Sequence, residues 1–220
     1  MERHFDTELT QLKQQLLKMG GLAETMVDDA VKSLVERDAS QLDQIYEREK
    51  EVNALQVSID ETCLKLTALY QPTAGDLRFL MGASKINTEL ERLGDQAINI
   101  CDVVKKLLQE PQLKPLIDIP KMVSIATDMV RDSLNAFVER NVDKAKAVLM
   151  QDDQLDDLKD KIVDELTDYM SKDSGSVSRA VQLICVARNL ERIGDHATNI
   201  AEDVIFVVQG KDIRHHAQDL

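Results

Sequence analysis

The fold of this chain is decided by one stretch that occurs twice, as Leu90-Glu91-Arg92-Leu93-Gly94-Asp95-Gln96-Ala97-Ile98-Asn99-Ile100 and, 100 residues later, as Leu190-Glu191-Arg192-Ile193-Gly194-Asp195-His196-Ala197-Thr198-Asn199-Ile200. Eight of the eleven residues are identical between the two copies. Self-similarity at a fixed spacing indicates two copies of one structural unit. Glycine inside a helical pattern costs about 1 kcal/mol relative to alanine, so Gly94 and Gly194 indicate places where another helix packs closely.

The repeat extends beyond this motif to whole units of three helices. A second match pairs Val35-Glu36-Arg37-Asp38 with Val138-Glu139-Arg140-Asn141, and each of these segments lies well upstream of the motif copy of its own unit. Apolar residues recur at helical spacing throughout both units. Pro72 ends the second predicted helix, because proline disfavours helix at the residue before it. Thr73 and Asp76 then predict a capping box at the start of the third helix.

Three prolines between Pro111 and Pro120 mark the best candidate for a linker. We therefore expect a first three-helix unit at residues 1–112 and a second at residues 113–220, with a frayed polar tail from Lys211 onward. The predicted fold is all-α, with two tandem antiparallel three-helix bundles related by an internal repeat.

Composition excludes several classes of protein. The net charge is −13, with 27 basic and 40 acidic residues and no basic block, which argues against binding to nucleic acid. The sequence shows no secretory signal, and its longest apolar run, residues 204–208, is far shorter than the roughly 20 residues that a membrane helix needs. Three widely spaced cysteines, Cys63, Cys101 and Cys185, are typical of buried free thiols. We expect a soluble cytoplasmic protein with an acidic surface.

Acidic residues form stripes at helical spacing, and each motif copy carries a pair four residues apart. Glu91 with Asp95, and Glu191 with Asp195, lie on one face of their helices. Two interpretations remain open. Such a stripe is usual for a solvent-facing helix. Carboxylates from neighbouring helices would also supply the hard oxygen ligands that suit Mg²⁺, Ca²⁺, Mn²⁺ or iron, and like charges at this spacing are otherwise unfavourable. We favour magnesium, manganese or iron at the two motif stripes.

The same spacing recurs on other predicted helices. On the second helix of the second unit it involves Asp153 and Asp157, and on that of the first unit Glu49 and Asn53. Further candidates for the metal-binding face are Asp29, Asp132, Asn99, Asn199, Asp102 and Glu202.

Catalysis has weaker support from the residues. The Glu-x-x-His pairs of ferritin-like di-iron bundles do not occur, and there is no glycine-rich phosphate loop, nucleophile elbow or zinc-binding spacing. His196 replaces Gln96 of the first copy, and we expect it to be a surface histidine. A carboxylate-bridged metalloenzyme and a purely structural helical scaffold remain as alternatives to a binding protein.

The motifs together resemble the PhoU family of phosphate-signalling proteins. The resemblance is carried by Met19-Gly20-Gly21, by Gln71-Pro72-Thr73-Ala74-x-Asp76-Leu77-Arg78 and by the two copies of Glu-Arg-x-Gly-Asp, and it runs from about Phe5 to about His215. It implies metal clusters on Glu/Asp-x-x-x-Asp motifs, which fall at Glu91/Asp95, Glu191/Asp195 and Asp153/Asp157, whereas Glu49/Asn53 departs from the pattern.

The resemblance also implies a function. It implies a non-enzymatic cytoplasmic homodimer that represses the phosphate regulon and modulates phosphate uptake. Such a protein would link the ATPase subunit of the phosphate ABC transporter to the sensor histidine kinase, and it would reach the membrane only through these partners.

Overall fold

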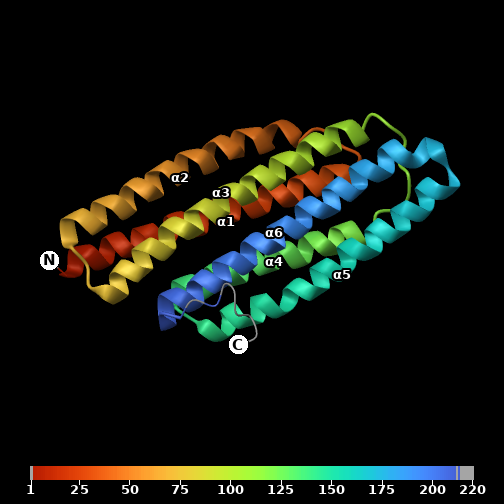
Figure 1. Ribbon diagram of the computed structural model, residues 1–220. Coiled ribbons are helices and arrows are strands. Elements are labelled where there is room, and N and C mark those ends of the chain that lie inside the picture. The colour runs from red at the N-terminus through yellow and green to blue at the C-terminus, as the bar shows by residue number, and fades with distance from the viewer. Residues whose placement is uncertain (1, 212, 214–220) are drawn as a thin grey trace.

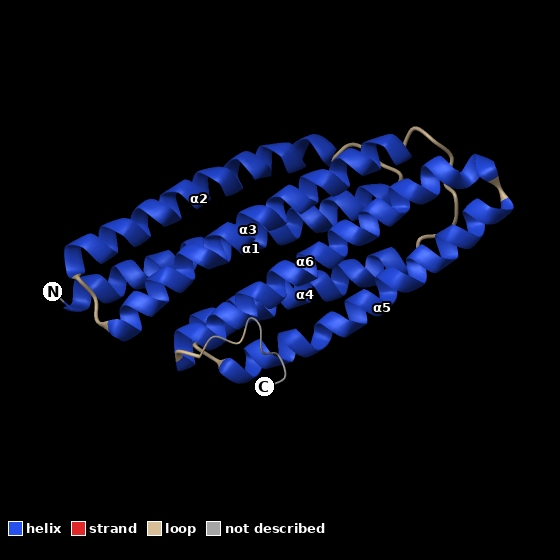
Figure 2. Ribbon diagram, viewed as in Figure 1, coloured by secondary structure: helices blue, strands red, loops and turns tan. Residues whose placement is uncertain are grey.

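Six long α-helices account for nearly all of the protein in the computed structural model, which describes residues 2–211 and 213 (Figures 1 and 2). The helices are α1 (Glu2–Glu36), α2 (Leu42–Tyr70), α3 (Ala74–Leu107), α4 (Asp118–Glu139), α5 (Val142–Lys172) and α6 (Val177–Gln209), with a short 3₁₀ turn at Ser174–Ser176. Within the described residues there is no strand and no helix long and apolar enough to cross a membrane. The all-α fold of two antiparallel three-helix bundles is confirmed. Most of the polar tail expected after Lys211 lies outside the described residues.

The first helix of each unit ends in the same way. Arg37 and Arg140 both adopt left-handed backbone conformations, with φ of 56° and 54°. The Arg37 guanidinium also donates a hydrogen bond of 3.1 Å to the carbonyl of Leu108, at the end of α3. The capping box expected at Thr73 is wrong in its details. Thr73 is the N-cap of α3, but its side chain makes no capping hydrogen bond.

The two bundles lie side by side and share one hydrophobic core (Figure 1). Helices α1 and α3 of the first bundle pack against α4 and α6 of the second, whereas α2 and α5 contact only elements of their own bundle within the described chain. The connection of residues 108–117 links the bundles. Cys63 and Cys101 are buried as expected, and Cys185 is half-buried.

Aromatic and small residues bring the bundles together. Phe79 of α3 and Phe137 of α4 are both buried and stack with ring centroids 4.6 Å apart. A Cβ atom at Gly82 would lie 2.4 Å from Val207 of α6, so the absence of a side chain permits the close approach of α3 and α6. The interface between the bundles is thus packed like the interior of either one.

Candidate functional site

The two motif copies meet at the centre of the contact between α3 and α6. These helices run antiparallel, with Lys85 Nζ 2.9 Å from Asp203 Oδ1 near one end and Ser178 Oγ 3.3 Å from Glu110 Oε1 near the other. This register places Gly94 and Gly194 level with each other, at the midpoint of the helix pair. The motif therefore lies on a local pseudo-two-fold axis that relates the two bundles.

His196 is a contact between the bundles and not the surface histidine that the sequence suggested. Its Nδ1 atom lies 2.7 Å from Glu89 Oε2, and the histidine side chain is only 13% exposed. Asn199 Nδ2 donates a second hydrogen bond of 3.1 Å to the same carboxylate. Burial alone would raise the pKa of Glu89, but the hydrogen bonds from His196 and Asn199 hold it below its usual range. The expectation failed because a single helix pattern does not show that α3 covers this face of α6.

The two motif glycines lie at helix crossings. Gly94 lies where α2, the outer helix of the first bundle, crosses the central helix α3, and Gly194 lies where the outer helix α5 crosses the central helix α6. A Cβ atom at Gly194 would lie 2.4 Å from Leu155 of α5 and 3.3 Å from Asp152 Oδ1. A Cβ atom at Gly94 would lie 3.3 Å from Val52 of α2. The absence of a side chain at each glycine allows the acidic faces of the paired helices to approach closely, and the approach is closest in the second unit.

The second unit gathers four carboxylates between α5 and α6. Asp152 and Asp156 of α5 face Glu191 and Asp195 of α6 closely enough to perturb one another. Burial and then repulsion from Asp195 and Asp156 raise the pKa of Asp152 to about 6. Burial likewise raises the pKa of Glu191 and of Asp195, with neighbouring acids adding to the shift. Lys159 is a nearby counter-charge, with its Nζ atom 3.9 Å from Glu191 Oε1.

Asp153 and Asp157, the residues expected here from the sequence, are both exposed on α5, one position beyond the acids that face α6. At 100° per residue, Asp153 points about 160° away from the buried Leu155, whereas Asp152 lies about 60° from it. The sequence held a signal for which acids of α5 face α6. The offset of 103 residues between Glu36 and Glu139 carries Glu49 to Asp152 and Asn53 to Asp156.

The first unit assembles a smaller version of this cluster between α2 and α3. Glu49 and Asn53 of α2 are joined by a hydrogen bond of 2.5 Å from Asn53 Nδ2 to Glu49 Oε1. Burial, followed by repulsion from Asp95, raises the pKa of Glu91, and Glu49 adds to the shift. Three carboxylates and one amide thus stand where the second unit has four carboxylates.

The further candidates scatter to other places. Asp29 forms an ion pair with Arg48 across α1 and α2, and Asp102 accepts a hydrogen bond from the Tyr46 hydroxyl. Glu202 borders a pocket between α3 and α6, beside Lys85 and Asn199. Asp132 and Asn99 are exposed. The partners of Asp29 and Asp102 are thus residues outside the two carboxylate clusters.

The donor set of each cluster suits a hard cation, but its side chains are not preassembled around one. Across residues 2–211 and 213, no three His, Cys, Asp or Glu side chains stand where they could hold one metal ion together. What the structure does provide is four mutually repelling acids in the second unit, partly offset by Lys159, Arg188 and Arg192. A cation there would offset the repulsion among these acids.

The raised pKa of Asp152 gives a test in the metal-free protein. Its pKa is about 6 in the folded chain against an ordinary value of 3.8, so folding favours the protonated form. The carboxyl therefore destabilises the fold increasingly as pH rises from about 4 through 6. Asp152→Asn should raise the melting temperature at pH 8, and its advantage should vanish near pH 4. Melts in EDTA over this pH range measure the effect, with exposed Asp153→Asn as the matched control. A benefit that is independent of pH would contradict the assignment.

Comparison with known proteins gives consistent matches. A family model described as the PhoU domain matches residues 16–104 and again 119–204. The phosphate-specific transport system accessory protein PhoU homolog of Pseudomonas putida is 38% identical over 216 residues, covering 98% of this chain and 84% of that protein. The phosphate-specific transport system accessory protein PhoU of Escherichia coli K12 is 34% identical over 215 residues, which cover 98% of this chain and 89% of the Escherichia coli protein. The crystal structure of PhoU from Pseudomonas aeruginosa superposes with a TM-score of 0.89 at 36% identity, covering 94% of this chain and 100% of that one.

Proposed function

The chain belongs to the PhoU family, and on that premise we propose that it is a non-enzymatic negative regulator of the phosphate regulon that modulates phosphate uptake. The names of its relatives describe accessory proteins of a phosphate-specific transport system, which supports a role in regulating phosphate transport. The observation that carries the proposal is the doubled PhoU domain, which extends over both bundles.

The proposed mode of action is that of an adaptor. In this role the protein contacts the ATPase subunit of the phosphate ABC transporter and the phosphate-sensing histidine kinase. It acts in the cytoplasm as a homodimer and reaches the membrane only through these partners. A net charge of −13 supports docking on basic surfaces, because a strong net charge steers association with oppositely charged partners. Rigid helices of about 30 residues present these acids over a long surface.

We also propose that the carboxylate clusters bind Mg²⁺, Mn²⁺ or iron. In the second unit the ligands would come from Asp152, Asp156, Glu191 and Asp195, and in the first from Glu49, Asn53, Glu91 and Asp95. A bound cation would supply positive charge between the outer and central helices of each bundle. The carboxylates would position the ion by rotating toward it, and the close crossing at Gly194 keeps both helices within reach.

Repression of the phosphate regulon can be tested in a deletion strain that carries a phosphate-responsive reporter. Loss of the protein should leave the reporter on in phosphate-rich medium, and expression of this chain should switch it off again. A phosphate-independent reporter in the same strains controls for general effects on transcription. Normal repression in the deletion strain would contradict the regulatory function.

A further inference from the structure

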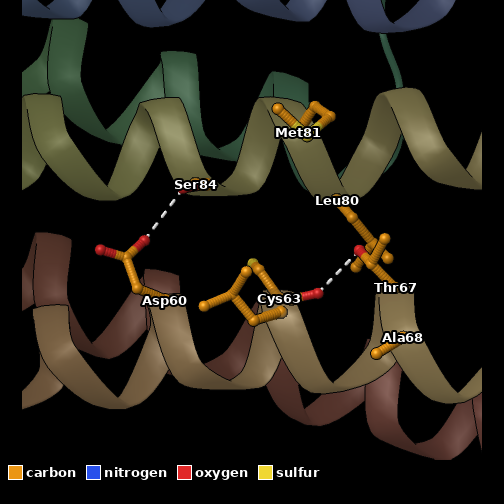
Figure 3. Close-up of a pocket in the computed structure, with 8 residues that line it drawn as sticks. Asp60, Cys63, Thr67, Ala68, Leu80, Met81 and Ser84 are labelled. Carbon is orange, nitrogen blue, oxygen red and sulfur yellow. Dashed lines mark hydrogen bonds between the residues drawn. The ribbon is translucent and has the colours of Figure 1, made fainter.

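An open groove lies on the outer face of the first bundle, between α2 and α3 (Figure 3). It has a volume of about 480 Å³ and is lined mainly by apolar side chains, including Cys63, Leu64, Leu80 and Met81. A hydrogen bond of 2.9 Å from Ser84 Oγ to Asp60 Oδ1 links the two helices along the groove, as the close-up shows. No lysine or arginine is among the residues that line it.

Two apolar residues of this groove, Leu64 and Met81, are strongly exposed, whereas Cys63 and Leu80 are buried. The side chains of Leu64 and Met81 are 72% and 52% exposed, and Val57 and Leu69 add further exposed apolar surface on α2. Contiguous exposed apolar surface marks interaction sites more often than isolated residues do. Leu64 and Met81 contribute little to the core beneath them.

The second repeat is an internal control for this interpretation. The buried residues Ile45, Val52 and Ile59 of α2 correspond, 103 positions later, to the buried Val148, Leu155 and Ile162 of α5. At the same offset, four exposed apolar or small residues of α2 correspond to polar residues of α5: Val57, Leu64, Ala68 and Leu69 become Asp160, Thr167, Ser171 and Lys172. Because the polar version folds into the same bundle, the fold does not require the exposed apolar residues of α2.

The seam between α2 and α3 continues from this groove into the acidic cluster of the first unit. The two helices remain in antiparallel register along the seam, through the hydrogen bond of 2.9 Å from Asn87 Nδ2 to the carbonyl of Gln56. Glu91 lies seven residues beyond Ser84 on α3, or about 10 Å along the helix. The apolar groove and the acidic cluster therefore lie along the same pair of helices, about two helical turns apart.

We propose that this surface, when its carboxylates hold no metal, binds an amphipathic helix of a partner protein, with its apolar residues in the groove and a lysine or arginine at the Glu91/Asp95 end. Apolar anchors at positions i, i+3 or i+4, and i+7 would fit such a groove, as in other helix-in-groove complexes. The acidic end selects a basic partner, which disfavours a second copy of this chain with its net charge of −13. The proposal deepens the adaptor function and rests on it.

A designed helical peptide provides a direct probe. It is 16 residues long and fluorescein-labelled, with leucines at i, i+4 and i+7 and two lysines placed two turns farther on. Its binding to the full chain is followed by fluorescence anisotropy in EDTA, so that no metal competes for the carboxylates. We expect Leu64→Glu to weaken binding at least 10-fold, because it places a charge in the apolar groove. Met150→Glu, at an equally exposed residue of α5, should leave binding unchanged.

Charge at the acidic end is tested separately with Glu91→Gln. This variant should weaken binding of the lysine peptide and leave unchanged the binding of a peptide with glutamines in place of both lysines. Circular dichroism melts of each variant confirm that it is folded. Absence of binding, or binding indifferent to Leu64→Glu, would overturn the proposal. So would a wild-type dimer that becomes monomeric in Leu64→Glu by sedimentation, because a second copy would then occupy the groove.

Expression in the deletion strain separates this proposal from the function on which it rests. If the wild-type chain restores repression and Leu64→Glu does not, the groove is required for signalling. If both restore repression, the groove proposal is wrong and the regulatory function stands. If the wild-type chain itself fails, the regulatory function is contradicted and with it the adaptor role that the groove would serve.

Discussion

Replacing Phe137 by alanine is expected to lower the free energy of unfolding by about 3–5 kcal/mol, the usual cost of removing a buried phenylalanine. Phe137 is 1% exposed and stacks on Phe79 of the other bundle with ring planes inclined by 13°. Removal of its ring would leave a cavity beside Phe79, at the contact between the two bundles. For a chain of this size, the loss corresponds to a fall of about 6–20 °C in melting temperature.

Urea and thermal denaturation followed by circular dichroism would measure this effect. Met150→Ala, at a residue of α5 that is 77% exposed, should change stability by no more than about 0.5 kcal/mol and serves as the control. Because both bundles share one core, wild-type unfolding should remain a single transition. A loss below 1 kcal/mol for Phe137→Ala, or two separate transitions in the wild type, would show that the bundles are energetically independent.

The second large effect is expected on metal binding. If the second cluster binds a cation as proposed, Asp156→Asn combined with Asp195→Asn should weaken Mn²⁺ binding there by more than about 100-fold. Changes to residues that merely orient a ligand already cost 10–100-fold, so loss of two charged ligands should cost at least as much. Each substitution keeps the side-chain size, and relief of like-charge repulsion should leave the helices intact or slightly more stable.

Isothermal titration calorimetry and elemental analysis give the affinity and the stoichiometry. The matched control is Asp153→Asn combined with Asp157→Asn, which removes the same charge from the exposed face of α5. We expect it to bind as the wild type does. If the control pair abolishes binding and the first pair does not, the ligands are the exposed acids and the assignment to the helix interface is wrong.

The fold was predictable from the sequence because its main determinants are local. The offset of 100 residues between Gly94 and Gly194, together with helical spacing of apolar residues, specified two units of three helices. Pairing between the bundles was not predictable, because it depends on which helix faces are covered by helices distant in the sequence. His196 illustrates this limit, since its partner Glu89 lies outside both copies of the motif.

The candidate site was predictable in its chemistry but not in its full register. Glu91, Asp95, Glu191 and Asp195 were found because the motif repeats them at a fixed spacing. Asp152 and Asp153 are adjacent acids, and helical periodicity on a mostly polar helix discriminates poorly between neighbours about 100° apart. Alignment of the two units to each other would have resolved the choice, because the buried residues of α2 from Leu42 to Cys63 correspond to buried residues of α5 at one offset.

The antiparallel pairing of α3 with α6 about a common midpoint has an evolutionary consequence. When two copies of one unit meet with the same face of each, the contact is isologous, the geometry of a symmetric homodimer. The tandem chain therefore has the architecture expected from gene duplication and fusion of a self-associating three-helix ancestor. Fusion lets the halves diverge, since one mutation no longer changes both sides of the contact. Gln96 of the first unit corresponds to His196 of the second, and Leu64 corresponds to Thr167. A true homodimer, with two identical chains, could not acquire such differences.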